Sequence, residues 1–283
     1  MDEVIRWMAL RDGGTYCDCT MGGAGHLTAM LRSSNTARFI GIDCDPDAVA
    51  YSRPQVKKFA GRCSIFEDNF VNLDLILNRL HVPCLDGMLL DLGISYHQVT
   101  TPARGFSFER DGPLLMRMSP GYTPLSDRLQ SASLPEVVRV LKEYGDVRNY
   151  RRLGRAIIDS RTDLKTTGDL RRLIENHVPR RFLKKNLHKV FQALRIWTND
   201  ELTNLRRGLA TAFRRLCREG RMLVISYHSG EDRIVKHYFR DLRAKGQLRL
   251  LSKKAIKPSD AEVLANPSAR SAKLRVVEKC ACC

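Results

Sequence analysis

The 283-residue sequence contains no apolar run of about 18 residues, the length that a helix needs to cross a bilayer. It also contains no internal repeat and no low-complexity linker. With 43% hydrophobic and 28% charged residues, it has the composition of an ordinary globular protein with a substantial core. These features exclude a repetitive or largely disordered chain and predict no transmembrane helix.

The first residues, MDEVIRWMALRDGG, do not have the pattern of a signal peptide. They predict a helix that ends at Gly13. The fold is therefore expected to begin almost at once, and any cleaved targeting segment would lie outside this chain.

The nine cysteines are odd in number and scattered from Cys17 to Cys283, which does not predict a disulfide framework in a chain of this size. We therefore expect a reducing environment. Cys17 and Cys19 have strand spacing and should face one side of a sheet. The terminal CACC contains one C-x-x-C pair, but no second pair is placed to complete a zinc site, so we predict no metal.

Acidic residues are too few to balance the basic ones. The sequence has 48 Lys and Arg against 31 Asp and Glu, which gives a net charge of +17, and the pI is about 9.8. This excess favours a polyanionic partner, above all nucleic acid, and fits poorly with an enzyme of small acidic metabolites. A generally basic protein from a basic proteome or compartment is the alternative.

Short apolar segments alternate with segments of helical periodicity in the first third of the chain. The expected strands are residues 15–19, 37–43, 63–66 and 85–91, and the expected helices between them are 25–33, 46–59 and 71–80. This alternation predicts a parallel sheet with helices on both faces.

From about Pro102 to Lys185 the alternation gives way to a loop and several helices. Ser133 with Glu136, and Thr198 with Glu201, have the spacing of capping boxes. The apolar run 220–228 then predicts a further strand of the sheet. We infer a doubly wound α/β domain that is interrupted by a helical insertion.

The stretch YCDCTMGGAGHL predicts a glycine-rich turn between the first strand and the first helix of the sheet domain. Such a turn lets the backbone and the helix N-terminus approach a nucleotide-like ligand. The third glycine of a dinucleotide fingerprint is missing, because its position is Thr28. Asp43 follows 18 residues after Gly25, where a carboxylate can accept both ribose hydroxyls. The pattern favours S-adenosylmethionine over NAD; a turn without a ligand and a solvated acid are the alternatives.

Eight segments, in order along almost the whole chain, carry a family resemblance. They are DCTMGGAGH, GIDCDPDA, DGMLLDLGIS, the glutamine at 98, RGFSFERDGPLLMRM, FQALRIWTNDEL, ISYHSGEDRIVK and NPSARSAKLRVVEK. Together they resemble the RsmH (MraW) family of S-adenosylmethionine-dependent methyltransferases. The resemblance implies a Rossmann-like class I methyltransferase sheet with an inserted helical domain. It also implies methylation of the exocyclic N4 amine of a cytosine in small-subunit ribosomal RNA, near the decoding centre.

The resemblance further implies which residues form the site. Asp91 ends the fourth strand and opens the DLGIS loop, in the place where amino-methyltransferases hold the target amine. From this we predict catalytic roles for Asp91, Ser95 and Tyr96. The implied cofactor contacts are Gly22, Gly23, Ala24, Gly25, His26, Asp43, Phe70, Asp91 and Gln98. On the residues alone, Asp91 could be a cap, Phe70 a core residue and His26 a simple hydrogen-bonding group at a helix N-terminus.

A target cytosine must leave its stack to reach the methyl group, which calls for a basic approach surface. Residues 120–185 hold 15 Lys and Arg against 8 Asp and Glu, so the insertion is the expected RNA face. The predicted RNA-binding residues are Arg151, Arg152, Arg155, Arg180, Arg181, His228, Arg233 and Lys236. A solvated helix face is the alternative for any one of these charges.

The chain departs from the family pattern mainly on the target side. Leu115 replaces a usual carboxylate, Tyr96 and His97 stand where Ser and Pro are usual, and NLHKV is a reduced form of the segment before FQALRI. The usual N-terminal H-x-P-V-L segment is also absent from this chain. These differences support a second hypothesis, a methyltransferase-derived assembly factor that binds ribosomal RNA without modifying it.

We expect a methyltransferase domain formed by residues 1–103 and 186–283, and a helical RNA-binding insertion formed by residues 104–185. The expected partners are small-subunit ribosomal RNA and the small-subunit precursor with other assembly factors. Neither a membrane nor DNA is expected as a partner. Because bacterial members of the family are usually far less basic, we predict the mitochondrial matrix as the location, with the bacterial cytoplasm as the alternative.

Overall fold

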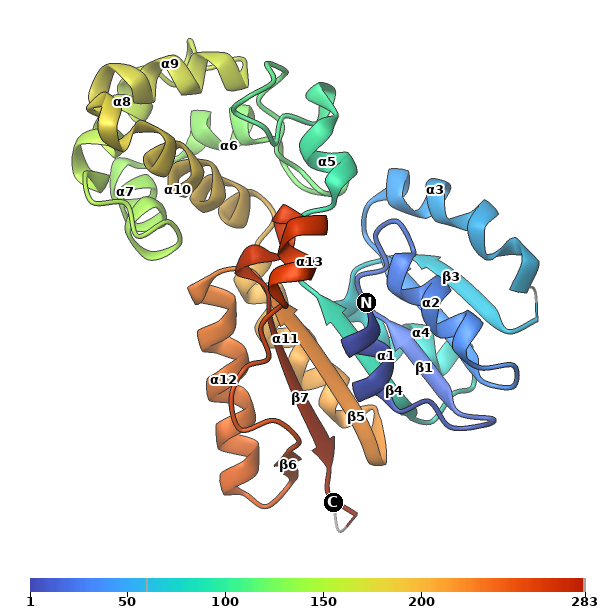
Figure 1. Cartoon of the computed structure of the whole chain (residues 1–283). Helices are drawn as coiled ribbons and strands as arrows, with labels where there is room; N and C mark the ends of the chain where they lie inside the picture. The colour runs from blue at the N-terminus through green and yellow to red at the C-terminus, as the bar shows by residue number, and fades with distance from the viewer. Residues whose placement is uncertain (60, 282–283) are drawn as a thin grey trace. The chain divides into compact units, whose positions relative to one another are not determined.

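The computed structural model describes residues 1–59 and 61–281. Within this range the chain forms two compact units (Figure 1). The first unit combines Met1–Gly93 with Leu202–Cys283, and the second is Ile94–Glu201. Among the described residues, no helix is both long and apolar enough to span a membrane.

The first unit is built on a seven-stranded sheet in the order β3-β2-β1-β4-β5-β7-β6. The strands are β1 (Thr15–Asp18), β2 (Arg38–Asp43), β3 (Cys63–Glu67), β4 (Leu85–Asp91), β5 (Leu216–Ser226), β6 (Leu248–Leu250) and β7 (Lys273–Lys279). The first five run parallel, whereas β7 pairs antiparallel with both β5 and β6. The predicted Rossmann-like α/β fold is confirmed, with an antiparallel pair at one edge.

Helices cover both faces of this sheet because the buried strands are apolar on both sides. One face packs against α1 (Asp2–Met8), α2 (Gly25–Ser33) and α3 (Pro46–Val56), and the other against α4 (Leu73–Arg79), α11 (Glu201–Arg214) and α12 (Ser229–Ala244). Successive side chains of β1 point to opposite faces of the sheet: Tyr16 lies in the core formed with α1, α2 and α3, and Cys17 in the core formed with α4, α11 and α12. Cys17 and Cys19 share a face as predicted, with their sulfur atoms 3.6 Å apart. The shorter elements of this unit are α13 (Asp260–Ala265) and the 3-10 helices η1 (Lys57–Phe59), η2 (Phe70–Asn72) and η4 (Pro267–Ser271).

The second unit is helical and has a core of its own. It contains α5 (Tyr96–Thr100), η3 (Pro102–Arg104), α6 (Leu125–Ser131), α7 (Leu134–Glu143), α8 (Tyr150–Asp159), α9 (Thr167–His177) and α10 (Arg180–Thr198). Its core consists of apolar side chains from the segment α6 to α10, together with Leu114 and Met116, which precede α6. The buried amide of Asn199 donates to the carbonyls of Met116 and Arg195 and accepts from the backbone N–H of Met118. Asn199 thereby joins the LLMRM segment to the end of α10.

The structure corrects the expected ends of two helices. The first helix ends at Met8 and not at Gly13, because Ala9 adopts a left-handed conformation with φ 47°. Thr198 does not cap the following helix: it is buried in α10, and its hydroxyl donates to the carbonyl of Leu194. Ser133 caps α7 as expected, accepting from the N–H of Glu136.

The helical unit extends further than the predicted insertion. It runs from 94 to 201, whereas residues 104–185 were expected. The C-terminal difference arises because α10 is one continuous helix, whose buried residues after position 185, such as Phe191 and Trp197, belong to the helical core.

Two neighbouring strands bring a pair of cysteines together. Cys84 directly precedes β4, and Cys217 is the second residue of β5, where the pairing of the two strands is irregular. The two cysteines form a disulfide. This bond departs from the reducing environment that the sequence led us to expect. In the terminal CACC, Cys282 and Cys283 lie outside the described residues, so the expectation for a metal there is not addressed.

Candidate active site

Three carboxylates lie at one edge of the sheet. Asp18, Asp43 and Asp91 are the last residues of β1, β2 and β4, three adjacent parallel strands. The carboxyl ends of parallel strands in an open sheet form the usual ligand crevice. Asp43 and Asp91 were predicted from the sequence, but Asp18 was not. Its signal was present, because it ends the first strand directly before the glycine turn.

The glycine turn joins β1 to α2 in a strained backbone path. Gly22 has φ 50°, and Ala24, the N-cap of α2, is left-handed with φ 58°. Asp43 holds the turn in place, because its Oδ2 accepts from the N–H of Gly22 at 2.7 Å. The hydroxyl of Ser52 on α3 donates to the carbonyl of Gly22 at 2.8 Å. Gly23 and Gly25 remain exposed, which leaves the turn open to a ligand.

Asp43 therefore has a structural role beside its predicted ribose contact. Its Oδ1 accepts from the N–H of Asp45 at 2.9 Å. Burial raises the pKa of Asp43, and the hydrogen bonds from the backbone N–H groups oppose this effect. Each oxygen of a carboxylate has two lone pairs, so both can accept a further hydrogen bond from a diol.

Asp91 is the centre of a small hydrogen-bonded cluster. Its Oδ1 accepts from the hydroxyl of Tyr227 at 2.9 Å, and its Oδ2 lies 3.5 Å from Nε2 of His26. Its backbone N–H donates to the hydroxyl of Thr20 at 2.6 Å. The Asp91 side chain is 25% exposed, so it remains accessible. Tyr227 is a member of this site that sequence reasoning missed, although it lies in the ISYHSGED segment.

His26 combines burial with two acidic neighbours. Burial opposes a charged imidazole, but the carboxylates of Asp91 and Asp18 outweigh it and raise the pKa of His26. Its Nδ1 is buried and has no hydrogen-bond partner among the residues that the structure describes. An unpaired buried nitrogen is costly, so a bound ligand or a water molecule is the expected partner.

Asp18 is almost completely buried, with 1% of its surface exposed. Burial raises the pKa of Asp18 to about 7, although His26 and the N–H of Thr20 act in the opposite direction. Asp18 therefore changes its charge near neutral pH, beside the glycine turn.

This shift predicts a pH-dependent stability. The pKa of Asp18 is about 7 in the folded chain and about 3.9 in an unfolded one. Between these values the folded state holds a proton that the unfolded state has released, so stability falls as the pH rises, by up to about 1.4 kcal/mol per pH unit. Asp18→Asn removes this dependence. Urea unfolding gives the free energy of unfolding of the variant and of the wild type at pH 5 and at pH 7. From pH 5 to pH 7 the variant should gain about 1–3 kcal/mol relative to the wild type. The same difference between the two proteins at both pH values would contradict the assignment.

Phe70 lies in η2, which follows the end of β3. Its ring packs closely on α11, since a Cβ at Gly208 would lie 2.2 Å from the ring. The ring is partly buried and contacts the core that contains α4 and α11. Phe70 therefore has a packing role, and its predicted cofactor contact remains a prediction.

Ser95 ends the DLGIS loop, and Tyr96 and Gln98 follow it in α5; all three belong to the helical unit. Ser95 and Gln98 form a capping box at α5: the Ser95 hydroxyl accepts from the N–H of Gln98, and the Gln98 side chain accepts from the N–H of Ser95. Gln98 is buried, whereas Tyr96 is 82% exposed. The contacts of Ser95 and Gln98 explain their place in the fold, and Tyr96 is left available for a stacking contact.

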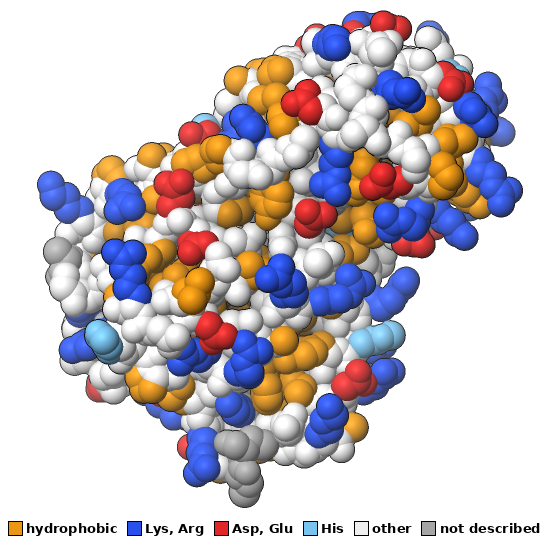
Figure 2. Space-filling model, turned by 180° about the vertical axis from the view of Figure 1, so that it is seen from behind, with side chains coloured by type: hydrophobic (Ala, Val, Ile, Leu, Met, Phe, Trp, Pro, Cys, Tyr) orange, Lys and Arg blue, Asp and Glu red, His pale blue; other side chains and the backbone are white. Residues whose placement is uncertain are grey.

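Most of the predicted RNA-binding residues are exposed. Lys and Arg side chains are spread over the face seen in Figure 2. Arg151, Arg152 and Arg155 are exposed on α8, and Arg180 and Arg181 begin α10. Arg233 and Lys236 are exposed on α12.

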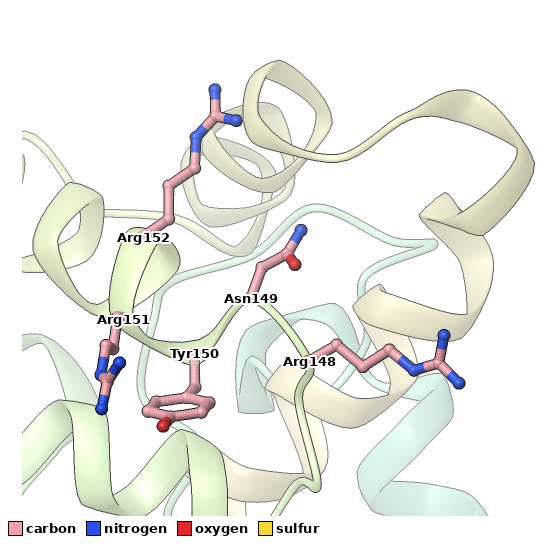
Figure 3. Close-up of a pocket in the computed structure, with 5 residues that line it drawn as sticks. All are labelled: Arg148, Asn149, Tyr150, Arg151 and Arg152. Carbon is pink, nitrogen blue, oxygen red and sulfur yellow. The ribbon is translucent and has the colours of Figure 1, made fainter.

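A shallow pocket of about 310 Å³ lies at the start of α8, lined by Arg148, Asn149, Tyr150, Arg151 and Arg152. Figure 3 shows that Arg148 and Arg152 point away from each other, while Arg151 lies beside the ring of Tyr150. The Arg151 guanidinium is 5.5 Å from the ring centre, and the ammonium group of Lys142 is 5.8 Å from it. Diverging cations of this kind suit an extended polyanion better than a small ligand.

His228 differs from the other predicted RNA contacts. Its Nδ1 accepts from the N–H groups of Gly230 and Glu231, so the ring caps α12. Its Nε2 lies 3.2 Å from a carboxylate oxygen of Glu231, although not at hydrogen-bond geometry. His228 therefore has a role in the fold, and its predicted RNA contact remains untested.

Comparison with known proteins places the chain in a family. The model of the MraW methylase family matches residues 1–280. The chain belongs to the MraW methylase family. Ribosomal RNA small subunit methyltransferase H of Thermotoga neapolitana is 39% identical, over 98% of this chain and 93% of that protein. The protein of the same name from Coprothermobacter proteolyticus is 41% identical with the same coverage.

A solved structure supports the fold. A Streptococcus mutans protein crystallised in complex with SAH superposes with a TM-score of 0.51 at 10% sequence identity, covering 98% of this chain and 96% of that one. At this identity the likeness concerns the fold only. Membership in the MraW methylase family confirms the family predicted from the sequence.

Methylase family membership also supports the predicted cofactor, S-adenosylmethionine. The site fits this cofactor in three respects: an open glycine turn, the acid Asp43 at the end of β2, and the unpaired buried nitrogen of His26. A dinucleotide fits the turn less well, because Thr28 stands in place of the third glycine of the dinucleotide fingerprint.

Asp43→Ala should weaken S-adenosylmethionine binding by roughly 1–3 kcal/mol, about 5- to 150-fold, since the polar partners of the carboxylate are left unpaired. Titration calorimetry measures this loss, and NAD should not compete. Because Asp43 also holds Gly22 and Asp45, urea unfolding of the variant must accompany the titration. Equal affinities for the variant and the wild type would remove Asp43 from the cofactor site.

Proposed function

We propose that this MraW-family protein transfers a methyl group from S-adenosylmethionine to the N4 amine of a cytosine in small-subunit ribosomal RNA, near the decoding centre, during subunit biogenesis. The observation that carries the proposal is the accessible carboxylate of Asp91 at the end of β4, beside the glycine turn of a methylase fold. Relatives about 40% identical over almost the whole chain are named small-subunit ribosomal RNA methyltransferases.

The chemistry explains why a carboxylate is needed. The lone pair of an N4 amine is delocalised into the cytosine ring, so the amine is a poor nucleophile and must be oriented. When bound, S-adenosylmethionine supplies an electrophilic methyl group, and the sulfur keeps the electron pair of the broken bond. Asp91 accepts a hydrogen bond from the amine and takes the proton that leaves the nitrogen as the new C–N bond forms.

The target base must first reach this carboxylate. A cytosine can be methylated only after it leaves its stack, and an exposed aromatic ring stabilises such a base. Tyr96, which is 82% exposed, is the proposed stacking group. Exposed arginines of α8 and α10 are proposed to bind the phosphate backbone of the ribosomal RNA. The full substrate is a small-subunit precursor that also carries other assembly factors.

Mass spectrometry of small-subunit ribosomal RNA from cells with and without this protein tests the proposal. We expect one N4-methylated cytosine to disappear when the protein is removed and to return when it is restored. An unchanged set of methylated cytosines would contradict the proposal.

The altered target-side residues favour a second candidate function. With Tyr96, His97 and Leu115 in place of the residues usual in the family, the protein could bind ribosomal RNA as an assembly factor without modifying it. In that case removal of the protein would impair subunit maturation while every methyl mark persisted.

We also propose that the protein works in the mitochondrial matrix. The net charge of +17 supports this location over the bacterial cytoplasm. Immunodetection in fractionated cells should find the protein with the small subunit of mitochondrial ribosomes, and its recovery in another compartment alone would refute this.

A further inference from the structure

Tyr227 occupies a defined position beside the carboxylate of Asp91. It directly follows β5, the strand that pairs with β4, and its hydroxyl donates to Oδ1 of Asp91 at 2.9 Å. Its backbone N–H donates to the buried carboxylate of Glu231 at 2.9 Å. The ring lies against Gly93, where a Cβ would be 3.3 Å from the ring edge. Both the ring and the backbone of Tyr227 are therefore fixed.

The hydroxyl can only act as a donor to this carboxylate. Burial and the negative charge of Asp91 raise the pKa of Tyr227, so its proton is retained at any working pH. A carboxylate can rotate about its terminal torsion, which has a broad energy minimum. One fixed donor on Oδ1 restricts this rotation and directs Oδ2 toward His26, whose Nε2 lies 3.5 Å away.

We propose that Tyr227 is a positioning residue that orients the carboxylate of Asp91 for the target amine. The proposal rests on the proposed methyl transfer and adds a residue to it. Tyr227 acts through Asp91 and has no contact of its own with the reacting atoms. A group that orients a proton acceptor affects the chemical step more than binding, because misalignment costs rate without removing a binding contact.

Tyr227→Phe keeps the ring against Gly93 and removes only the hydroxyl. We expect kcat for methyl transfer to fall by about tenfold or more, while KM for the RNA and Kd for S-adenosylmethionine change by less than about twofold. Tyr238→Phe is the matched control, because Tyr238 is another partly buried tyrosine of the same unit and the charged group that acts on it is Arg214, not Asp91. A normal kcat in Tyr227→Phe, or an equal loss in Tyr238→Phe, would overturn the proposal.

The titration of His26, followed by NMR of its imidazole protons, tests the same proposal without catalysis. The charged groups that raise its pKa are Asp91 and Asp18, and the chain's amino terminus lowers it. When Tyr227→Phe removes the donor to Oδ1 and lets the Asp91 carboxylate turn, the titration midpoint of His26 should shift from that of the wild type. In an Asp91→Asn background, Tyr227→Phe should cause no further change.

These two readouts separate the proposal from the function on which it rests. If the wild-type protein transfers no methyl group, the proposed function fails, and the His26 titration alone decides the role of Tyr227. If the wild type is active but Tyr227→Phe alters neither kcat nor the His26 midpoint, the positioning role fails and the function stands.

Discussion

Asp91→Asn should reduce methyl transfer by about 10²–10⁴-fold, the usual contribution of a positioned proton acceptor. The amide keeps the shape of the carboxylate and can still accept from the Tyr227 hydroxyl. It cannot take a proton from the amine, so the chemical step is lost while RNA affinity stays nearly intact. Single-turnover transfer to small-subunit ribosomal RNA and a parallel RNA-binding titration measure the two quantities.

Asp12→Asn is a suitable control for this experiment. Asp12 is an exposed acid before β1 that accepts from the Thr36 hydroxyl, a hydrogen bond that an amide can replace. Its variant should transfer methyl groups normally. If Asp91→Asn left methyl transfer unchanged, Asp91 would not be the proton acceptor. If the wild type transferred no methyl group and Asp91→Asn left subunit maturation untouched, the protein would be the assembly factor.

Replacing Arg151, Arg152 and Arg155 together by Glu should weaken RNA binding and flatten its dependence on salt. These arginines are exposed on α8. Each lost phosphate contact reduces the slope of log affinity against log salt by roughly 0.7–0.9, so three contacts account for a change of about 2–3. Fluorescence anisotropy with a ribosomal RNA fragment at several salt concentrations measures the slope.

The same number of charge reversals elsewhere provides the control. Arg32, Arg38 and Lys57 are exposed. Arg38 is the first residue of β2, whereas Asp43 of the candidate site is the last, so Arg38 lies at the end of the strand opposite to the site. Changing these three to Glu alters the net charge equally but should leave the slope within about one unit of the wild-type value. An unchanged slope in the α8 variant would place the RNA face elsewhere.

The sheet was largely predictable because buried parallel strands are continuous apolar runs. Helix α2 matches its expected range of 25–33, and the first four strands differ from theirs by one residue at most. The fifth strand begins at Leu216, earlier than expected. Its first residues include polar ones such as Arg218 and Glu219, so the apolar run alone did not predict this start. The antiparallel edge formed by β6 and β7 has no comparable apolar run and was not predicted from periodicity.

The candidate site was only partly predictable, for reasons that concern burial. Asp18 lies at the end of a buried strand. Because a buried acid is uncommon, the sequence pattern indicated the glycines as site residues and not Asp18. The contact of Tyr227 with Asp91 joins residues 136 positions apart, and it depends on the pairing of β4 with β5. The capping box of Ser95 and Gln98 could have been predicted, because S-x-x-Q is its usual pattern.

The central claim is that this chain methylates a cytosine amine, and one measurement tests it most directly. Purified protein is incubated with isotopically labelled S-adenosylmethionine and a small-subunit precursor that lacks the mark, and the RNA nucleosides are then analysed by mass spectrometry. We predict a labelled methyl group on the N4 amine of a single cytosine, absent from the same reaction with Asp91→Asn. Precursor that binds the protein, yet carries no labelled cytosine after prolonged incubation, would contradict the claim.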